Sequence, residues 1–126
     1  PRGAGEVIMI EGNAQVCAAL QRQIAKLEAN QVQAIHSSAE HWLKGDSMTG
    51  AFDIVFLDPP FDHLTSLPTT LRNLANSAML AEGAVIYIES SSAQGSPVSD
   101  ISCLTLNKEK VFGGVTARLY RYHHKD

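Results

Sequence analysis

Apolar residues in this chain fall into short continuous runs, which alternate with longer stretches of helical spacing. Four segments built around such runs, each five or six residues long, occupy 6–11, 32–36, 52–57 and 84–89. Short apolar runs are typical of buried strands in a parallel sheet, and we expect the run 54–57 to be covered on both faces. The alternation therefore predicts the order β-α-β-α-β-α-β.

The first helical stretch follows Asn13, whose side chain can cap a helix N-terminus. Its apolar positions recur at spacings of four, four and three residues, which predicts one buried helical face. The residues of this face are Val16, Leu20, Ile24 and Leu27. We expect the helix to end near Asn30.

Start signals predict two further helices. Ser37 and Glu40 form a capping-box pattern before a short helix that carries Trp42 and stops near Gly45. The segment 66–68, with its proline, is typical of the first turn of a third helix. The expected buried face of that helix is Leu67, Leu71, Leu74 and Ala78.

The end of the chain has a different pattern. Gly83 is expected to end the connection before the fourth strand. After that strand, residues 90–100 are polar and predict a loop. Two final strands are predicted at about 101–112 and 115–122, and the Gly113-Gly114 pair is typical of a hairpin turn. Residues 1–126 are therefore expected to form a single α/β domain: a parallel sheet with helices on both faces and a C-terminal antiparallel hairpin.

Candidate chemistry follows the 52–57 run, in the tetrapeptide Asp58-Pro59-Pro60-Phe61. Prolines cannot donate to a sheet ladder, and a residue before proline is driven out of the helical region. We therefore expect Asp58 on a stiff turn at the carboxyl end of a buried strand, an edge where open α/β sheets bind ligands. A strand that merely stops at a Pro-Pro turn is the alternative.

Two other turns follow predicted strands. Glu11 ends the first strand, where an acid can accept hydrogen bonds from both hydroxyls of a ribose; a solvated acid is the alternative. The Ser38-Ala39 peptide could bind an adenine edge, or it could simply cap a helix. Because these turns follow successive strands, their joint order is a stronger signal than any one of them.

The composition, with 44% hydrophobic and 18% charged residues, is that of an ordinary globular protein. No apolar run reaches membrane-spanning length and no signal peptide is visible, so a cytoplasmic location is predicted. Cys17 and Cys103 are expected to be small buried residues, because neither the cysteines nor the histidines show metal-ligand spacing. No metal is expected.

Charge is distributed unevenly along the chain. The net charge is −3, but residues 107–126 carry five bases against two acids, whereas residues 1–106 carry five bases against eleven acids. A basic end on an acidic body can contact phosphates. Scattered surface charge is the alternative interpretation.

A family resemblance rests on stretches that occur in a fixed order. These are Ile-Glu-Gly-Asn (10–13), His-Ser-Ser-Ala (36–39), Leu-Asp-Pro-Pro-Phe (57–61), Ile-Tyr-Ile-Glu-Ser (86–90), Lys-Glu-Lys-Val-Phe-Gly (108–113) and Arg-Leu-Tyr (118–120). Asp-Pro-Pro-Phe resembles the motif of S-adenosylmethionine-dependent amino-methyltransferases, and alone it identifies only that class. The whole order, which covers nearly the entire chain, resembles the bacterial RsmD family, which methylates the exocyclic N2 of a guanine in small-subunit ribosomal RNA.

The resemblance implies a Rossmann-like methyltransferase fold with S-adenosylmethionine as cofactor. It implies ribosomal RNA, or the assembling small ribosomal subunit, as partner. On this basis Glu11 would hold the cofactor ribose, and Ser38 and Ala39 would flank its adenine.

The same resemblance assigns the Asp58–Phe61 turn to catalysis. Asp58, which also borders the cofactor, and the carbonyl of Pro59 would accept hydrogen bonds from the target amine, on a turn completed by Pro60. Phe61 would stack on a base flipped into the pocket, as enzymes that act on bases require.

The chain also departs from the family pattern. A strand and a glycine-rich loop precede the matched part in the family, and Gly3 and Gly5 do not restore that loop. We therefore expect a sheet without its usual first strand, with unpaired edges through which the chain could self-associate. The alternative functions are an N6-adenine or N4-cytosine nucleic-acid methyltransferase and a non-catalytic methyltransferase fragment.

Overall fold

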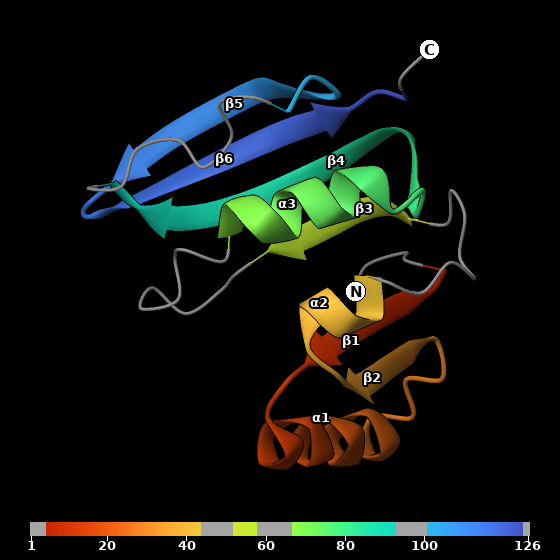
Figure 1. Ribbon diagram of the computed structural model, residues 1–126. Coiled ribbons are helices and arrows are strands. Elements are labelled where there is room, and N and C mark those ends of the chain that lie inside the picture. Colours follow the sequence, from red (N-terminus) through yellow and green to blue (C-terminus); the bar gives the residue numbers. More distant parts are fainter. Residues whose placement is uncertain (1–4, 44–51, 58–66, 93–100, 125–126) are drawn as a thin grey trace. The chain divides into compact units, whose positions relative to one another are not determined.

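The computed structural model describes residues 5–43, 52–57, 67–92 and 101–124 (Figure 1). The chain divides into two compact units, residues 1–44 and residues 45–126. The described helices and strands follow the predicted order, with three helices between the first four strands and a hairpin at the end. The predicted succession of elements is confirmed.

The first unit contains two parallel strands, β1 (Val7–Glu11) and β2 (Val32–His36), with Glu11 opposite His36. Helices α1 (Ala14–Lys26) and α2 (Ala39–Leu43) lie on opposite faces of this strand pair (Figure 1). Met9 in the middle of β1 is 39% exposed, so the expectation of a fully buried first strand is wrong. The reason is that β1 pairs with β2 alone among the described strands.

The ends of α1 are set by local hydrogen bonds. The Asn13 side chain accepts from the backbone N–H of Val16 at 3.0 Å, so the predicted N-cap is confirmed. Leu27 is the C-cap, and Glu28 has a φ of 53°, a left-handed conformation that no helix continues through. The helix therefore ends before the expected Asn30.

The buried face of α1 is centred one residue away from the predicted position. Cys17 is 1% exposed and is the buried residue of this helix, while Leu20 and Ile24 are half-buried. Val16 and Leu27 are 46% and 72% exposed, so their assignment to the face is wrong. The helix packs mainly against β2, and this narrow contact covers Cys17 and leaves both ends of the apolar stripe in water.

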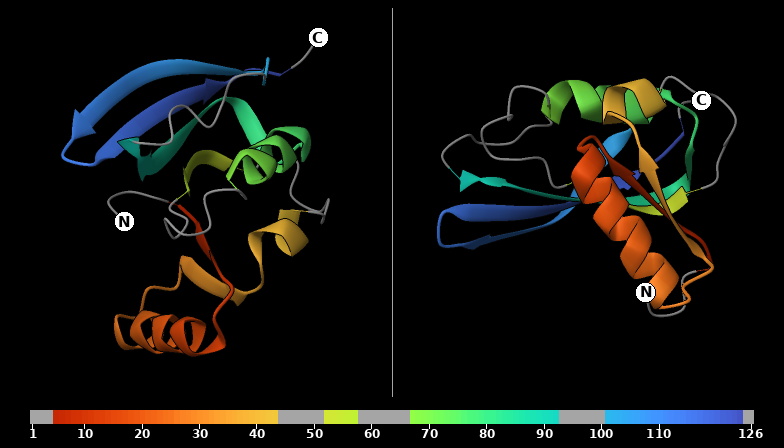
Figure 2. Two further views of the ribbon diagram at one scale, coloured as in Figure 1. Left: turned by 60° about the vertical axis from the view of Figure 1, so that its left-hand side comes forward. Right: turned by 90° about the horizontal axis from the view of Figure 1, so that it is seen from below.

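The second unit is a four-stranded sheet with strand order β3-β4-β6-β5. The β3–β4 pair is parallel and the other two pairs are antiparallel, as the predicted hairpin requires. Helix α3 (Leu67–Asn76) covers one face of this sheet (Figure 2). The strands are β3 (Phe52–Leu57), β4 (Leu80–Ser91), β5 (Leu104–Phe112) and β6 (Val115–Tyr122).

The core of the second unit lies between α3 and the central strands. Leu71 of α3, Ile86 and Ile88 of β4, and Tyr120 of β6 are 2% exposed or less. Ala78, which we expected on the buried face, lies beyond the end of α3 with a φ of 63° and is exposed. The helical spacing could not reveal that the helix stops two residues earlier.

Strand β4 is longer than predicted at both ends. It begins at Leu80 and passes through Gly83, whose φ of +80° coincides with a register shift against β3. Gly83 therefore forms an irregularity within the strand and does not end a loop. At the other end, Ser90 and Ser91 belong to the strand, so the predicted loop at 90–100 is wrong for these two residues.

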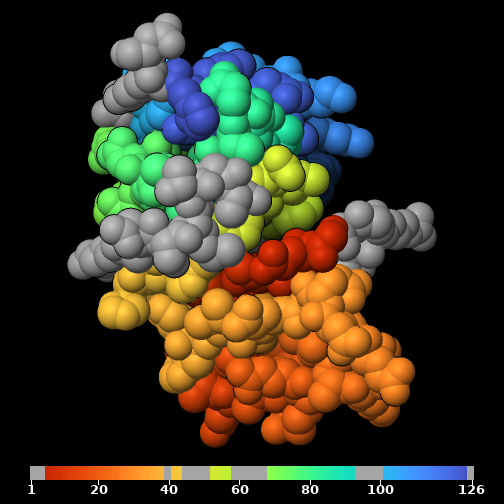
Figure 3. All heavy atoms as spheres, turned by 90° about the vertical axis from the view of Figure 1, so that its right-hand side faces the viewer, coloured from red at the N-terminus to blue at the C-terminus, as the bar shows by residue number. Residues whose placement is uncertain are grey.

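The opposite face of β3 is open. Ile54 and Phe56 are 61% and 73% exposed, and atoms of β3 reach the surface in Figure 3 (yellow). The prediction that this strand is covered on both faces is therefore wrong. Among the described elements of the second unit, β3 pairs only with β4 and α3 covers only the other face. Self-association of the chain through unpaired sheet edges stays a prediction.

The C-terminal hairpin turns at Gly113, whose φ of 62° suits glycine, and the predicted turn is confirmed. Cys103 is buried at 5% exposure, as expected, but it lies in the turn just before β5. None of the described helices is long and apolar enough to span a membrane.

A polar clamp joins the end of β6 to the start of β4. Glu82 accepts from the backbone N–H of His124 at 2.6 Å, and its carboxylate lies 3.3 Å from the Nδ1 atoms of both His123 and His124. The Nε2 atom of His124 donates to the carbonyl of Leu80 at 3.1 Å. The backbone N–H of His124 lowers the pKa of Glu82 below its ordinary value of 4.5.

Glu82→Gln should make the stability of the protein less dependent on pH between pH 6 and pH 3. A lowered folded-state pKa gives a stabilising contribution that is complete above the unfolded value and lost as pH falls through the folded value. Urea midpoints measured from pH 6 to pH 3 should therefore decrease more in the wild type than in Glu82→Gln. An unchanged slope in Glu82→Gln would contradict the clamp.

Candidate functional site

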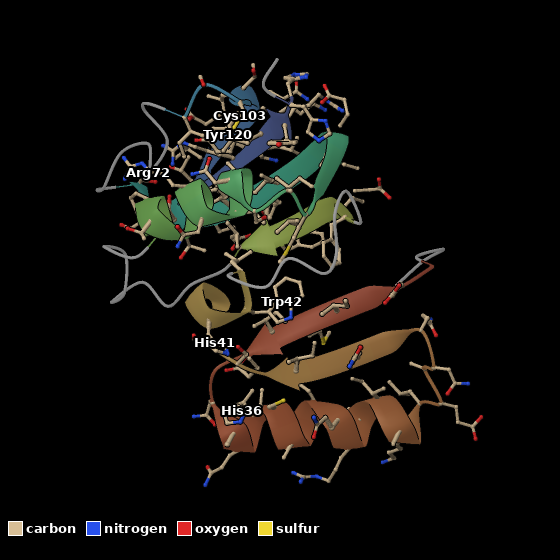
Figure 4. The ribbon with its side chains drawn as sticks, turned by 45° about the vertical axis from the view of Figure 1, so that its right-hand side comes forward. His36, His41, Trp42, Arg72, Cys103 and Tyr120 are labelled. Carbon is tan, nitrogen blue, oxygen red and sulfur yellow. The ribbon has the colours of Figure 1, made fainter. Side chains whose placement is uncertain are left out.

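The carboxyl ends of β1 and β2 form one continuous edge, where two of the sequence-predicted turns meet. The backbone N–H of Ser37 donates to the carbonyl of Glu11 at 3.1 Å. His36 Nε2 lies 3.2 Å from the carbonyl of Gly12, and because a carbonyl only accepts, this nitrogen donates. Figure 4 shows His36 and His41 beside the ends of the two strands. Glu11 and the Ser37–Ser38 turn are thus held together.

The Glu11 carboxylate is oriented by its own chain. Its Oε1 atom accepts from the backbone N–H of Asn13 at 3.0 Å, and the residue is half-buried. The same Asn13 caps α1, so helix start and carboxylate position depend on one another. A carboxylate fixed in this way at a strand end has the chemistry to accept hydrogen bonds from vicinal hydroxyls.

Ser38 is the N-cap of α2. Its Oγ atom accepts from the backbone N–H of His41 at 3.0 Å, and its carbonyl accepts from the N–H of Trp42 at 3.0 Å. Ser37 donates its hydroxyl to the Ser38 carbonyl at 2.9 Å and caps nothing. The predicted capping box on Ser37 is therefore wrong by one residue, and the helix-cap interpretation of Ser38 is confirmed. Ala39 is the first residue of α2.

The remaining predicted site residues, Asp58, Pro59, Pro60 and Phe61, lie outside the described residues. The chain reaches them from Leu57, the last residue of β3, which pairs with Ile88 of the parallel strand β4. Within the second unit, β3 therefore ends at the carboxyl edge of a parallel pair, and the turn expected at 58–61 stays a prediction.

Two polar arrangements were missed in the sequence. One is the hydrogen bond from His36 to the carbonyl of Gly12 beside Glu11: the sequence showed that this histidine lacks metal-ligand spacing, but not which residue it would contact. The other surrounds Arg118, a 6% exposed residue on β6, which donates to Glu109 at 2.8 Å and to Ser90 at 3.2 Å. The signal for the second was available, because Arg118 occupies an inward position in the alternation of β6.

In the described part of the chain, no three His, Cys, Asp or Glu side chains are placed to share a metal ion. The polar chemistry at the joined ends of β1 and β2 consists of carboxylate, hydroxyl, imidazole and backbone groups. This edge of an α/β sheet is where such folds bind nucleotides.

Solved structures define the class of fold. An S-adenosylmethionine-dependent methyltransferase from Aquifex aeolicus superposes with a TM-score of 0.70 over 96% of this chain and 71% of its own, at 14% identity. A putative methyltransferase from Escherichia coli superposes with a TM-score of 0.88 over 97% of this chain and 67% of its own, at 32% identity. The chain has the Rossmann-like fold of these methyltransferases.

The family follows from the sequence comparison. The model of the family described as "Conserved hypothetical protein 95" matches residues 1–121, and the chain belongs to this family, which is the RsmD family. "Ribosomal RNA small subunit methyltransferase D" from Escherichia coli K12 is 33% identical over 120 residues, covering 95% of this chain and 59% of that protein. The protein of the same name from Haemophilus influenzae is also 33% identical, covering 95% and 62%. The chain thus spans about three fifths of the length of these relatives.

Ser38→Ala should destabilise the first unit, whereas Ser37→Ala should not. Loss of a serine N-cap costs about 1 kcal/mol, because the N–H of His41 loses its partner. Both variants remove one hydroxyl from the same turn, so each controls for the other. Urea unfolding followed by Trp42 fluorescence measures the difference, and an equal or reversed effect would restore Ser37 as the cap.

Proposed function

We propose that the protein to which this chain belongs transfers a methyl group from S-adenosylmethionine to the exocyclic N2 of a guanine in small-subunit ribosomal RNA. The observation that carries the proposal is membership of the RsmD family over residues 1–121. The joined ends of β1 and β2 support it, because they place Glu11 and the Ser38 turn at one edge. A cytoplasmic location stays a prediction.

The residues at this edge fit the nucleoside half of the cofactor. Glu11 Oε1 is engaged by Asn13, so the carboxylate is already oriented, and its other oxygen supplies further acceptor positions for ribose hydroxyls. The Ser38–Ala39 peptide would flank the adenine, at a turn where the Ser38 hydroxyl accepts from the backbone N–H of His41. When bound, S-adenosylmethionine supplies an electrophilic methyl group on a sulfonium.

The chain would prepare the amine through Asp58 and Pro59. An exocyclic amine conjugates its lone pair into the base and is therefore a poor nucleophile. Two acceptors fixed on its N–H groups favour a pyramidal nitrogen and stabilise the positive charge that develops during transfer. A carboxylate and a carbonyl held by proline geometry provide such acceptors without a flexible side chain.

The remaining steps concern the base and the proton. Phe61 would stack on the flipped guanine, and in-line placement of the amine would supply much of the rate. Asp58 need not be a strong base, because the methylated amine is acidic enough to lose its proton afterwards. The partner in this proposal is ribosomal RNA or an assembling small subunit.

Glu11→Ala and Asp58→Ala should separate cofactor binding from turnover in the full-length protein. Asp58→Ala should abolish methyl transfer from S-adenosylmethionine to small-subunit RNA while leaving the Kd for S-adenosylhomocysteine within a few-fold of wild type. Glu11→Ala should weaken that Kd roughly tenfold or more, since hydrogen bonds to a charged group contribute about 1.5–3 kcal/mol.

Calorimetric titration and a tritium-transfer assay measure the two quantities, and each variant is the control for the other. Transfer retained in Asp58→Ala would remove Asp58 from the catalytic role. An unchanged Kd in Glu11→Ala would remove Glu11 from the ribose site.

A further inference from the structure

We propose that the distal half of the β5–β6 hairpin, residues 108–115, is a contact surface for RNA, in which Lys108 and Lys110 neutralise phosphates and Phe112 stacks on a base. The inference rests on the proposed function and adds to it a substrate-binding element outside the predicted site. The evidence for it is the charge, the exposure and the strand register of these residues.

Strand register places the start of this surface level with the end of β3. Phe56 of β3 pairs with Tyr87 of β4, Tyr87 pairs with Leu119 of β6, and Leu119 pairs with Lys108 of β5. Lys108 is thus level with the penultimate residue of β3. The three strand spacings of about 4.8 Å put it roughly 14 Å across the sheet from Phe56.

The rest of the hairpin continues in the direction of the carboxyl ends of β3 and β4. Ser91, the last residue of β4, pairs with Val115, and Val115 pairs with Phe112. Ile88 is the partner of Leu57, and the row of Ser91 lies three residues beyond it. Three residues of strand correspond to about 10 Å. In Figure 1 the hairpin turn lies at the same end as the arrowheads of β3 and β4. An RNA strand with its target base just beyond the end of β3 would therefore reach the hairpin within a few nucleotides.

The side chains on one face of β5 suit an RNA strand. Lys108, Lys110 and Phe112 alternate along the strand and therefore share a face, the one opposite to α3. All three are exposed, Phe112 by 47%. Lysines beside an exposed aromatic ring are the combination that binds single strands, through phosphate charge and base stacking.

Glu109, the acid between the two lysines, does not lie on this face. Glu109 points to the other face and accepts from the Nε atom of Arg118 at 2.8 Å, and Arg118 also donates to Ser90. These two contacts of the buried Arg118 balance the charge of Glu109 and join the hairpin to β4. Among the described residues no ion pair of Lys108 or Lys110 is present, and Glu89, the acid of β4 on the same face, accepts from the Tyr87 hydroxyl.

The competing interpretation is that the lysines only protect an exposed sheet edge from pairing with another chain. The two interpretations differ in salt dependence. Each phosphate that a lysine neutralises contributes about 0.7–0.9 to the slope of log K against log salt concentration, and edge protection contributes nothing to it.

The experiment measures binding of a fluorescently labelled transcript of small-subunit ribosomal RNA by the full-length protein at several salt concentrations. K108A/K110A should bind roughly tenfold more weakly at 0.1 M salt and lower the slope by about 1.5. R22A/K26A, which removes two exposed charges from α1, is the matched control and should keep the wild-type slope. Phe112→Ala should weaken binding roughly tenfold at an unchanged slope, and Phe112→Trp should restore it.

The outcomes separate this inference from the proposed function. Equal slopes for K108A/K110A and R22A/K26A, or no RNA binding by the wild type, would overturn the hairpin surface. Methyl transfer to the transcript with a wild-type KM in K108A/K110A would overturn it too, while the proposed function would stand. Hairpin-dependent binding without any methyl transfer would leave the surface intact and contradict the proposed function.

Discussion

Parallel pairing of strands is the constraint on which the candidate site depends. Because β1 and β2 run in the same direction, their carboxyl ends meet, and the bond between Ser37 and Glu11 joins the two turns there. The parallel β3–β4 pair likewise brings Leu57, which precedes Asp58 in the sequence, to the carboxyl edge of its sheet. Antiparallel neighbours would have put these turns at opposite edges of their sheets. The proposed chemistry therefore depends first on the strand topology, which brings the turns to one edge, and only then on the individual side chains.

The C-terminal hairpin depends on a different kind of contact. Arg118 is buried between Glu109 of β5 and Ser90 of β4, so one guanidinium links three neighbouring strands. A buried charge of this kind is costly when its partners are missing, so the contacts with Glu109 and Ser90 favour the observed alignment of β5 and β6 on β4. That alignment carries the hairpin past the carboxyl end of β3. The network thus connects the packing of the second unit with the surface we assign to RNA.

The sequence predicted the succession of elements well and their surroundings less well. Apolar runs and turn residues located every described strand, because those signals are local. Burial is not local: Ile54 and Phe56 have the composition of a covered strand, and only the sheet order shows that their face is open within the second unit. The one-residue error between Ser37 and Ser38 has a similar origin, because either serine satisfies the capping pattern. For the candidate site, the placement of Glu11 beside the Ser38 turn could be predicted from strand order alone.

The central claim is that this chain belongs to an enzyme that methylates the exocyclic N2 of a guanine. The Asp58–Phe61 turn would suit an N6-adenine or N4-cytosine methyltransferase equally well, because each target is an exocyclic amine. The most direct measurement is nucleoside mass spectrometry of small-subunit ribosomal RNA after incubation of the unmethylated RNA with the full-length protein and S-adenosylmethionine. Our account predicts one added N2-methylguanosine per RNA. N6-methyladenosine or N4-methylcytidine without N2-methylguanosine would contradict it.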